Sequence, residues 1–347
     1  MKQRIRIADV AKLARVSAGT VSAVINGRVG EKIRVSSETQ QRVWDAVQEL
    51  EYVANPAARS LAGGYNQLLG VFTYEPIFPV EHHNFYYRFL VGIEHEAERS
   101  GYDLVLFTST GGTDGKRLIY RKDSNRLRLT DGAILLGLQE DKREVQRLLQ
   151  EEFPFVFIGR REVPQGEISY VAPDYIEAAS EVVSYIAGHG HRQIAYFRSI
   201  RYGEPAQDRE RGYCLAHERL SLPLGPDLIV HLDPEALTID LFQTFLNKGV
   251  TAFIAEDDAL GLALLRAAAQ LHKAPPQDFS LAVLGNPLTS SSEDIPDWTT
   301  FLVPRREIGI EAVRLLIHML AQRDEPGPHQ KMVPCIFVPG KTVGSFH

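Results

Sequence analysis

Apolar residues recur with helical spacing three times within residues 1–64. The first stripe is interrupted at Arg15, Ser17 is a good N-cap for a second helix, and Ser37 with Gln40 forms the capping box of a third. Three short helices with a tight turn between the first two are the plan of a helix-turn-helix; a small helical bundle for protein contact is the alternative. The stripes are Ile7, Val10, Ala11 and Ala14, then Val21, Val24 and Ile25, then Val43, Val47 and Leu50.

Short side chains are expected on the outward side of the second helix. Thr20, Ser22 and Asn26 are polar groups of the kind that bond phosphate oxygens. This favours DNA binding over protein contact. The positions that the apolar stripe leaves facing outwards are Ser17, Ala18, Gly19, Ser22 and Ala23.

From residue 65 onward, short apolar runs alternate with stretches of helical spacing such as 86–99. Short buried strands separated by helices predict a parallel, doubly wound sheet with helices on both faces. The length of this region favours two lobes, and ligands of open α/β sheets bind beyond the carboxyl ends of the strands. The strand candidates are 68–74, 102–110, 131–137, 155–159, 193–197, 251–255 and 280–285.

Composition narrows the class of protein. With 44% apolar and 24% charged residues among 347, the chain is typical of a globular protein of two or three domains, and no apolar run reaches 18 residues. The first residues contain no apolar segment with a small-residue cleavage site, so a cytoplasmic location is expected. Cys214 and Cys335 lie far apart and outside any C-x-x-C, which argues against a disulfide framework or a thiolate zinc site.

Charge is distributed unevenly along the chain. Residues 1–64 hold ten Lys and Arg against six Asp and Glu, whereas residues 65–347 hold 28 against 38. A basic head on an acidic body indicates that the head meets a polyanion.

Three motifs that resemble catalytic or cofactor sites have simpler explanations. Residues 338–342 end like a phosphate-binding loop, but Cys335 stands where its first glycine is required. His189 and His191 have no acidic or cysteine ligand spaced to complete a zinc site, and residues 256–258 supply too few oxygen ligands for a hard cation. Without a nucleophile elbow either, we expect no cofactor, no metal and no enzymatic activity.

The stretch IADVAKLARVSAGTVSAVING (7–27), followed by YVANPAARSL (52–61), resembles the amino-terminal headpiece of the LacI/GalR family of transcriptional regulators. The resemblance implies that the second helix reads the major groove and that NPAARSL becomes a hinge helix only on DNA. Leu61 would then wedge a minor-groove base step apart, with Ala58 at the contact between the two hinges of a dimer. The implied DNA contacts are Ile7, Ser17, Ala18, Gly19, Thr20, Ser22, Ala23, Asn26, Asn55, Ala58, Arg59 and Leu61.

The headpiece departs from the family pattern in two places. Ala18, Gly19 and Ala23 stand where large base-reading side chains are usual, and they cannot form bidentate hydrogen bonds with bases. Direct readout is therefore expected to be thin, with more specificity carried by the hinge and by DNA deformability. The loop 30–35 is a few residues longer than usual, with Lys32 and Arg34 available for backbone contacts or simply solvated.

The resemblance continues through TDGAILLG, FVFIGR, DRERGYCLA and TAFIAEDDALGLALL. It implies the fold of the periplasmic sugar-binding proteins, in which two lobes joined by three crossovers enclose an effector. The crossovers are expected near 168–171, 299–302 and 329–332. The implied domains are a helix-turn-helix domain at 1–51, a hinge helix and linker at 52–64, and an effector-binding and dimerisation domain at 65–347, with one lobe at 65–169 and 301–331 and the other at 170–300 and 332–347.

The same resemblance implies the residues of the effector cleft. Arg209 and Asp258 match an arginine and an acidic position that bond effector oxygens, which is what a polyol requires, and Asp174 matches another pocket aspartate. Because residues 75–84 and 284–287 depart from the family pattern, the effector's identity is not implied. The remaining candidates are the aromatic residues Tyr74, Phe85 and Tyr86, for which core packing is the alternative, and the rim positions Arg160, His231 and Asn286.

We therefore expect a homodimeric regulator that a mono- or oligosaccharide releases from a near-palindromic double-stranded DNA operator, without membrane contact. One alternative is a corepressor-type regulator that responds to a purine or another non-sugar ligand. The other is a sugar-binding or sugar-active protein with a vestigial headpiece. A ligand screen distinguishes a carbohydrate effector from the ligand of a corepressor-type regulator. Binding to DNA upstream of the chain's own gene distinguishes a regulator from a protein with a vestigial headpiece.

Overall fold

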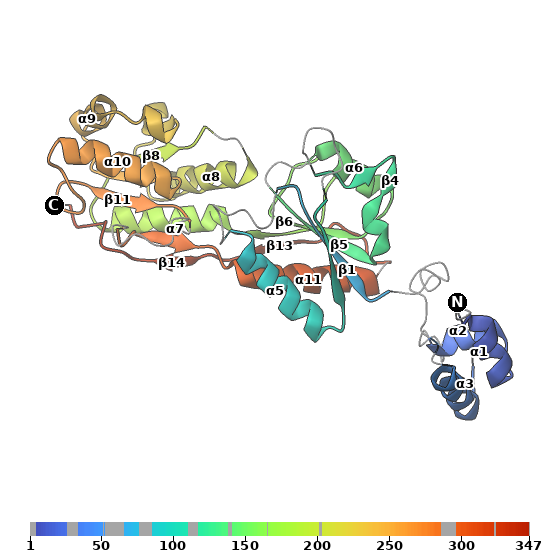
Figure 1. Ribbon diagram of the computed structural model, residues 1–347. Coiled ribbons are helices and arrows are strands. Elements are labelled where there is room, and N and C mark those ends of the chain that lie inside the picture. Colours follow the sequence, from blue (N-terminus) through green and yellow to red (C-terminus); the bar gives the residue numbers. More distant parts are fainter. Residues whose placement is uncertain are drawn as a thin grey trace. The chain divides into compact units, whose positions relative to one another are not determined.

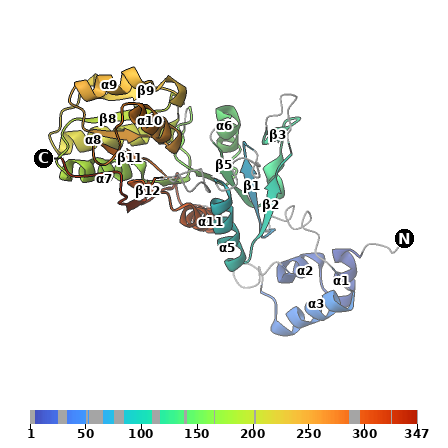
Figure 2. The ribbon, with the colours of Figure 1, turned by 60° about the vertical axis from the view of Figure 1, so that its left-hand side comes forward.

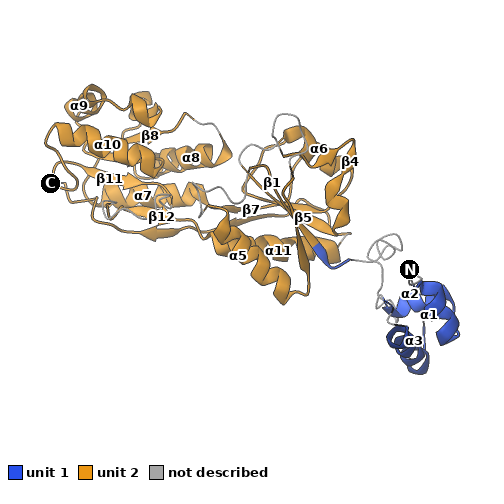
Figure 3. Cartoon of the chain, in the orientation of Figure 1, with its two compact units in different colours: residues 1–68 blue, residues 69–347 orange. Residues whose placement is uncertain are grey.

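The computed structural model of the protein describes residues 5–25, 34–50, 52, 66–75, 85–109, 117–137, 141–164, 166–200, 203–285, 296–322 and 324–346. The chain forms two compact units, residues 1–68 and residues 69–347 (Figure 3). Among the described helices, none is long and apolar enough to cross a bilayer.

The first unit contains three short helices around an aliphatic core. They are α1 (Ile7–Ala14), α2 (Ala18–Ile25) and α3 (Ser37–Glu49), close to the spans that the apolar stripes predict. Ser17 caps α2 as expected, because its Oγ accepts a hydrogen bond from the backbone N–H of Thr20 at 3.0 Å. The buried core consists of Val10, Ala11, Ala14, Val21, Val24, Val43 and Ala46.

The start of α3 differs from the sequence expectation by one residue. Ser36, and not Ser37, is the N-cap, and its Oγ accepts from the N–H of Thr39 at 3.3 Å. The side chain of Gln40 donates to the carbonyl of Val35 at 3.0 Å instead of closing a box on Ser37. Two adjacent serines offer the same hydroxyl, so the extended backbone at Ser36 decides which of them caps the helix.

The second unit contains two larger sheets, each covered by helices on both faces (Figures 1 and 2). The first sheet has the strand order β13-β7-β6-β5-β1-β2, and its described pairings are parallel. Leu69 and Val71 point toward α5 and α11, whereas Phe72 points to the opposite face with α6, as the two-residue period of a strand requires. The elements are β1 (Leu68–Thr73), α5 (Tyr87–Arg99), β2 (Asp103–Phe107), β5 (Gly132–Leu136), α6 (Lys142–Gln150), β6 (Phe155–Ile158), β7 (Tyr170–Pro173), α11 (Arg305–Ala321) and β13 (Gln330–Val333).

The second sheet has the order β11-β10-β8-β9 and is also parallel. Tyr196 and Ile254 face α7 and α8, and Phe197 and Phe253 face α9 and α10. The predicted doubly wound α/β architecture is thus confirmed. The elements are α7 (Tyr175–Gly188), β8 (Ile194–Arg198), α8 (Glu204–Arg219), β9 (Ile229–His231), α9 (Ile239–Asn247), β10 (Ala252–Ala255), α10 (Asp258–Gln270) and β11 (Ser280–Val283).

The chain passes between the two sheets a few residues later than the sequence predicted. The first sheet retains β7 through Pro173 and β13 through Val333, because these strands pair with each other from Tyr170 opposite Gln330. The remaining passage follows β12 and precedes α11, at residues 303–304. The small elements are β3 (Tyr120–Arg121) with β4 (Ser124–Asn125), antiparallel β12 (Thr300–Leu302) with β14 (Ile336–Val338), and 3-10 turns at Arg126–Leu129, Pro226–Leu228 and Pro234–Ala236.

Helices α5 and α11 lie side by side at unusually short range (Figures 1 and 2). A Cβ on Gly309 would stand 2.3 Å from the carbonyl oxygen of Phe89, and a Cβ on Gly92 would stand 2.0 Å from that of Arg306. Only glycine at both positions permits this approach. Further along, the buried Glu96 accepts hydrogen bonds from Arg314 and links the two helices again.

Candidate functional site

The outward side of α2 has mostly the exposure that the sequence predicted. Ser17, Ala18 and Gly19 are exposed, and Thr20 is half-buried with its hydroxyl 2.9 Å from Ser17 Oγ. Ala23 was predicted to face outwards, but it is 3% exposed and lies on the buried side of α2, because α2 packs against both α1 and α3.

The other predicted DNA contacts divide into two groups. Ile7 and Ser22 are half-buried, and Ile7 packs against the core of the unit. The remaining predicted DNA contacts, Asn26, Asn55, Ala58, Arg59 and Leu61, lie outside the described residues. Asn286, a predicted effector contact, lies outside them too.

A cavity of about 50 Å³ opens in the second unit where β5, β6 and β7 end and α5, α7 and α8 begin. Parallel α/β sheets place ligand sites at this edge. Phe85 and Tyr86, both predicted, are among its walls and meet edge to face with ring centroids 4.9 Å apart. The lining residues are Phe85, Tyr86, Phe89, Leu136, Gly137, Ile158, Gly159, Arg161, Pro173, Tyr175 and Pro205.

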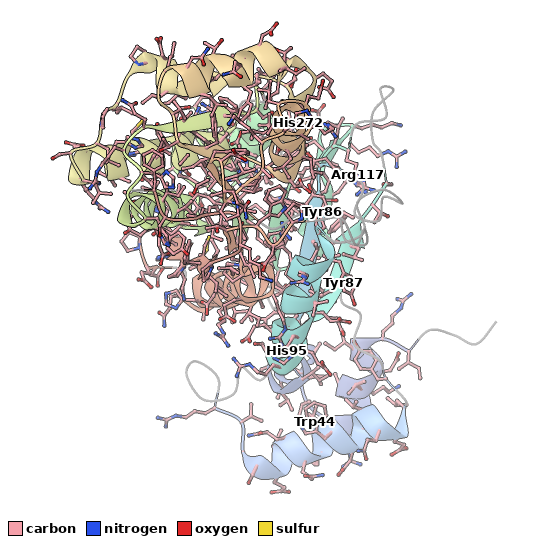
Figure 4. The ribbon with its side chains drawn as sticks, turned by 90° about the vertical axis from the view of Figure 1, so that its left-hand side faces the viewer. Trp44, Tyr86, Tyr87, His95, Arg117 and His272 are labelled. Carbon is pink, nitrogen blue, oxygen red and sulfur yellow. The ribbon has the colours of Figure 1, made fainter. Side chains whose placement is uncertain are left out.

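A polar cluster stands behind the aromatic wall. The hydroxyl of Tyr86 donates to Glu75 Oε2 at 2.7 Å, and Arg117 donates to Thr73 Oγ1 at 2.8 Å. Burial, together with the neighbouring carboxylate of Glu75, raises the pKa of Tyr86 well above its usual value. Figure 4 shows Tyr86 at the start of α5 with Arg117 nearby. Tyr86 is therefore a neutral donor held in place at the cavity.

Of the two adjacent arginines after β6, the structure places Arg161 at the cavity and Arg160 elsewhere. Arg161 donates to the carbonyl of Arg160 at 2.6 Å and stands 4.8 Å from the Phe157 ring centroid. Arg160 instead forms a fork with Asp208, with nitrogen–oxygen distances of 2.9 and 3.0 Å. This hydrogen bonding raises the pKa of Arg160 above its usual value. Gly159, at φ +103°, turns the chain between the strand and these side chains.

Arg209 lies beside the cavity wall that Tyr175 forms. Its guanidinium stands 4.4 Å from the Tyr175 ring centroid, and its Nη1 is 3.5 Å from Glu256 Oε1. Glu256 also accepts the backbone N–H of Ser199 at 2.8 Å. Burial raises the pKa of Glu256, and the positive charge of Arg209 opposes that rise. Tyr175 and Glu256 were missed as ligand-site residues, although Glu256 directly follows a predicted strand.

The remaining effector candidates do not line the cavity. Tyr74 is buried against Phe72, with ring centroids 4.9 Å apart, which is the core packing offered as its alternative. Asp174 caps α7 by accepting the N–H of Glu177 at 3.1 Å, and Asp258 is buried at the start of α10.

His231 belongs to a separate cluster. Its Nε2 is 3.2 Å from Glu210 Oε2, and Glu210 also pairs with the buried Arg198.

The arrangement is suited to binding a ligand. Aromatic faces offer stacking surfaces for a sugar ring, and the arginine side chains donate to oxygens. In the part of the chain that the structure describes, no group of three His, Cys, Asp or Glu side chains is placed to hold a metal ion.

Comparisons with known proteins agree with both units. Residues 6–55 match the model of the bacterial regulatory proteins of the lacI family, and residues 183–343 match that of the periplasmic binding protein-like domain. The maltose regulon regulatory protein MalI of Escherichia coli is 26% identical over 98% of this chain and 99% of its own length. The transcriptional regulator CelR of Thermobifida fusca is 29% identical over 91% of this chain and 92% of its own length. The solved complex of a regulator CelR with cellobiose superimposes with a TM-score of 0.60 at 25% identity, covering 98% of this chain and all of that one. These relatives are transcriptional regulators and not enzymes.

Proposed function

The chain belongs to the LacI family of bacterial regulatory proteins, and on that premise we propose that it is a homodimeric transcriptional repressor of the cytoplasm that a carbohydrate releases from its operator. The observation that carries the proposal is the cavity of the second unit, with aromatic walls and an adjacent arginine, in the same chain as a helix-turn-helix unit.

The cavity supports a carbohydrate as the effector class. Phe85, Tyr86 and Tyr175 line the cavity with their rings, and Arg209, whose Nε has no hydrogen-bond acceptor among the described residues, lies against the ring of Tyr175. Sugar hydroxyls both donate and accept, so they fit an arginine with spare donors. A relative's structure with cellobiose is in keeping with this class.

The two sheets give the effector a means of action. The cavity takes Leu136, Ile158 and Pro173 from the first sheet and Pro205 from α8, which covers the second. A ligand that contacts both sides favours one degree of closure. We propose that closure changes the spacing of the two 52–64 segments of a dimer. Linkage then requires that operator DNA weakens effector binding by the factor by which the effector weakens DNA binding.

The proposal is tested with the full chain and fluorescent DNA from upstream of its gene. We expect anisotropy to report binding that falls on addition of a mono- or oligosaccharide. Arg209→Ala removes the sugar response and keeps DNA binding. Arg211→Ala, on the same helix but exposed, is the matched control and keeps both. A response that survives in Arg209→Ala refutes the pocket, and binding strengthened by a purine refutes release by a carbohydrate.

A further inference from the structure

The start of α11 carries a buried arginine that lacks an anionic partner. Arg305 is 8% exposed, and its guanidinium stands 4.9 Å from the centroid of the Phe85 ring, which lines the cavity. Among the residues that the structure describes, no carboxylate lies within ion-pair distance of its side chain. Burying a charge without an opposite charge is costly, so this arginine does not serve the stability of the ligand-free protein.

The charges around Arg305 make that burial more costly. Burial lowers the pKa of Arg305, and the nearby positive charges of Arg88 and Arg209 lower it further. A guanidinium nevertheless stays protonated at neutral pH. The carboxylates of this region are engaged elsewhere, because Glu256 meets Arg209 and Ser199 and Asp174 caps α7.

The two arginines flank the same part of the cavity wall. Arg305 lies over Phe85, Arg209 lies over Tyr175, and both rings line the cavity. Arg209 keeps its Nε without an acceptor among the described residues, and no ion pair engages Arg305 there.

We propose that Arg305 binds an oxyanion carried by the effector, so that the effector is a sugar bearing a phosphate or a carboxylate group. The proposal rests on the proposed function, since it assigns the chemical class of the ligand of that cavity. A guanidinium is a planar fork that matches two oxygens of either group, and the aromatic walls beside it accept the sugar ring. Arg209 adds a second donor to the same ligand.

The test compares sugars with their charged counterparts on the full chain by isothermal titration calorimetry. The pairs are glucose with glucose 6-phosphate and with glucuronate, and maltose and cellobiose with their 6′-phosphates, beside inorganic phosphate alone. We expect one charged sugar to bind about 10- to 100-fold more tightly than its neutral counterpart, as a charge-assisted bond to a buried partner allows. The phosphate and uronate arms identify the anion.

Variants then assign the preference to Arg305. Arg305→Met abolishes the ratio between charged and neutral sugar, Arg305→Lys keeps part of it, and Arg306→Met, at the exposed neighbour, keeps all of it. Neutral sugars that bind and release DNA as well as their charged counterparts overturn the oxyanion site and leave the proposed function intact. Binding of inorganic phosphate as tight as that of a sugar phosphate overturns the proposal of a charged sugar. Failure of every sugar to bind overturns both proposals.

A second readout needs no ligand. Arg305→Met retains the apolar stem and removes the unpaired charge, so we expect the melting temperature of the free protein to rise by about 2–4 °C. Arg306→Met leaves it unchanged. A fall of the melting temperature in Arg305→Met would show that the charge is satisfied within the protein and would overturn the proposal.

Discussion

The fork between Arg160 and Asp208 connects the loop after β6 of the first sheet to α8 on the second. Its two nitrogen–oxygen distances are 2.9 and 3.0 Å, and the two side chains are 24% and 7% exposed. Hydrogen bonds to charged groups contribute about 1.5–3 kcal/mol, and a bidentate pair that is mostly buried lies at the upper end of that range. We therefore expect a coupling energy of about 2–3 kcal/mol between these side chains.

The coupling is measured by a double-mutant cycle of Arg160→Met and Asp208→Asn in urea unfolding. Trp298 is buried in the second unit and reports its unfolding once the exposed Trp44 of α3 is replaced by phenylalanine. The pair Arg219–Glu177, at 3.3 Å but 53% and 62% exposed, is the matched control and should couple by less than about 1 kcal/mol. Equal coupling in the two cycles would refute the claim that burial makes the first pair strong.

Three further predictions concern stability. Gly309→Ala should lower the free energy of unfolding, measured in urea, by about 1–3 kcal/mol, because its Cβ meets the backbone of Phe89. Gly188→Ala, whose Cβ meets no atom, should leave it unchanged, and an unchanged value for Gly309→Ala would contradict the close packing. Tyr86→Phe should lower the free energy of unfolding by about 1–2 kcal/mol in the same assay, because the hydrogen bond to Glu75 is lost. Tyr87→Phe, at the exposed neighbour, should leave it unchanged, and equal effects of the two variants would refute the contribution of that hydrogen bond. Burial lowers the pKa of His217, so the stability contributed by neutral His217 is fully present above an unfolded pKa of about 6.5 and is lost as pH falls toward the folded pKa, by up to about 1.4 kcal/mol per pH unit. The melting temperature of His217→Leu should therefore fall less steeply in acid than that of wild type or of the exposed His95→Gln, and an unchanged slope would refute this.

The apolar runs predicted most of the fold because a strand buried on both faces needs continuous apolar sequence. The runs at 131–137 and 155–159 became β5 and β6 with little change of boundary. The family resemblance implied crossovers at β7 and β13 instead. The apolar pattern marks neither segment as a strand, because YVAP is short and ends in proline, and QKMV is half polar. Their pairing with each other is a tertiary fact that neither sequence carries alone.

The candidate site was predicted less completely, since direction matters there more than residue type. Phe85 and Tyr86 reach the cavity, but adjacent Arg160 and Arg161 could not be told apart without the turn at Gly159. Arg305 carries no signal in the sequence, because an arginine in the first turn of a helix is ordinarily solvated. Its burial follows from α5, which is adjacent to it only in the folded chain.

The glycine contact between α5 and α11 has a mechanical consequence. Helix α5 begins at Tyr87, directly after Phe85 and Tyr86 of the cavity wall, and α11 begins at Arg305, which lies over Phe85. The two helices meet at Gly92 and Gly309 and again where Glu96 meets Arg314. Because the two helices contact each other at two separate points, neither can slide or bend without the other. The pair therefore works as one stiff lever about 20 Å long, at 1.5 Å per residue over the 13 residues of α5. We therefore expect a displacement of either helix at its cavity end to move both helices together, including their far ends.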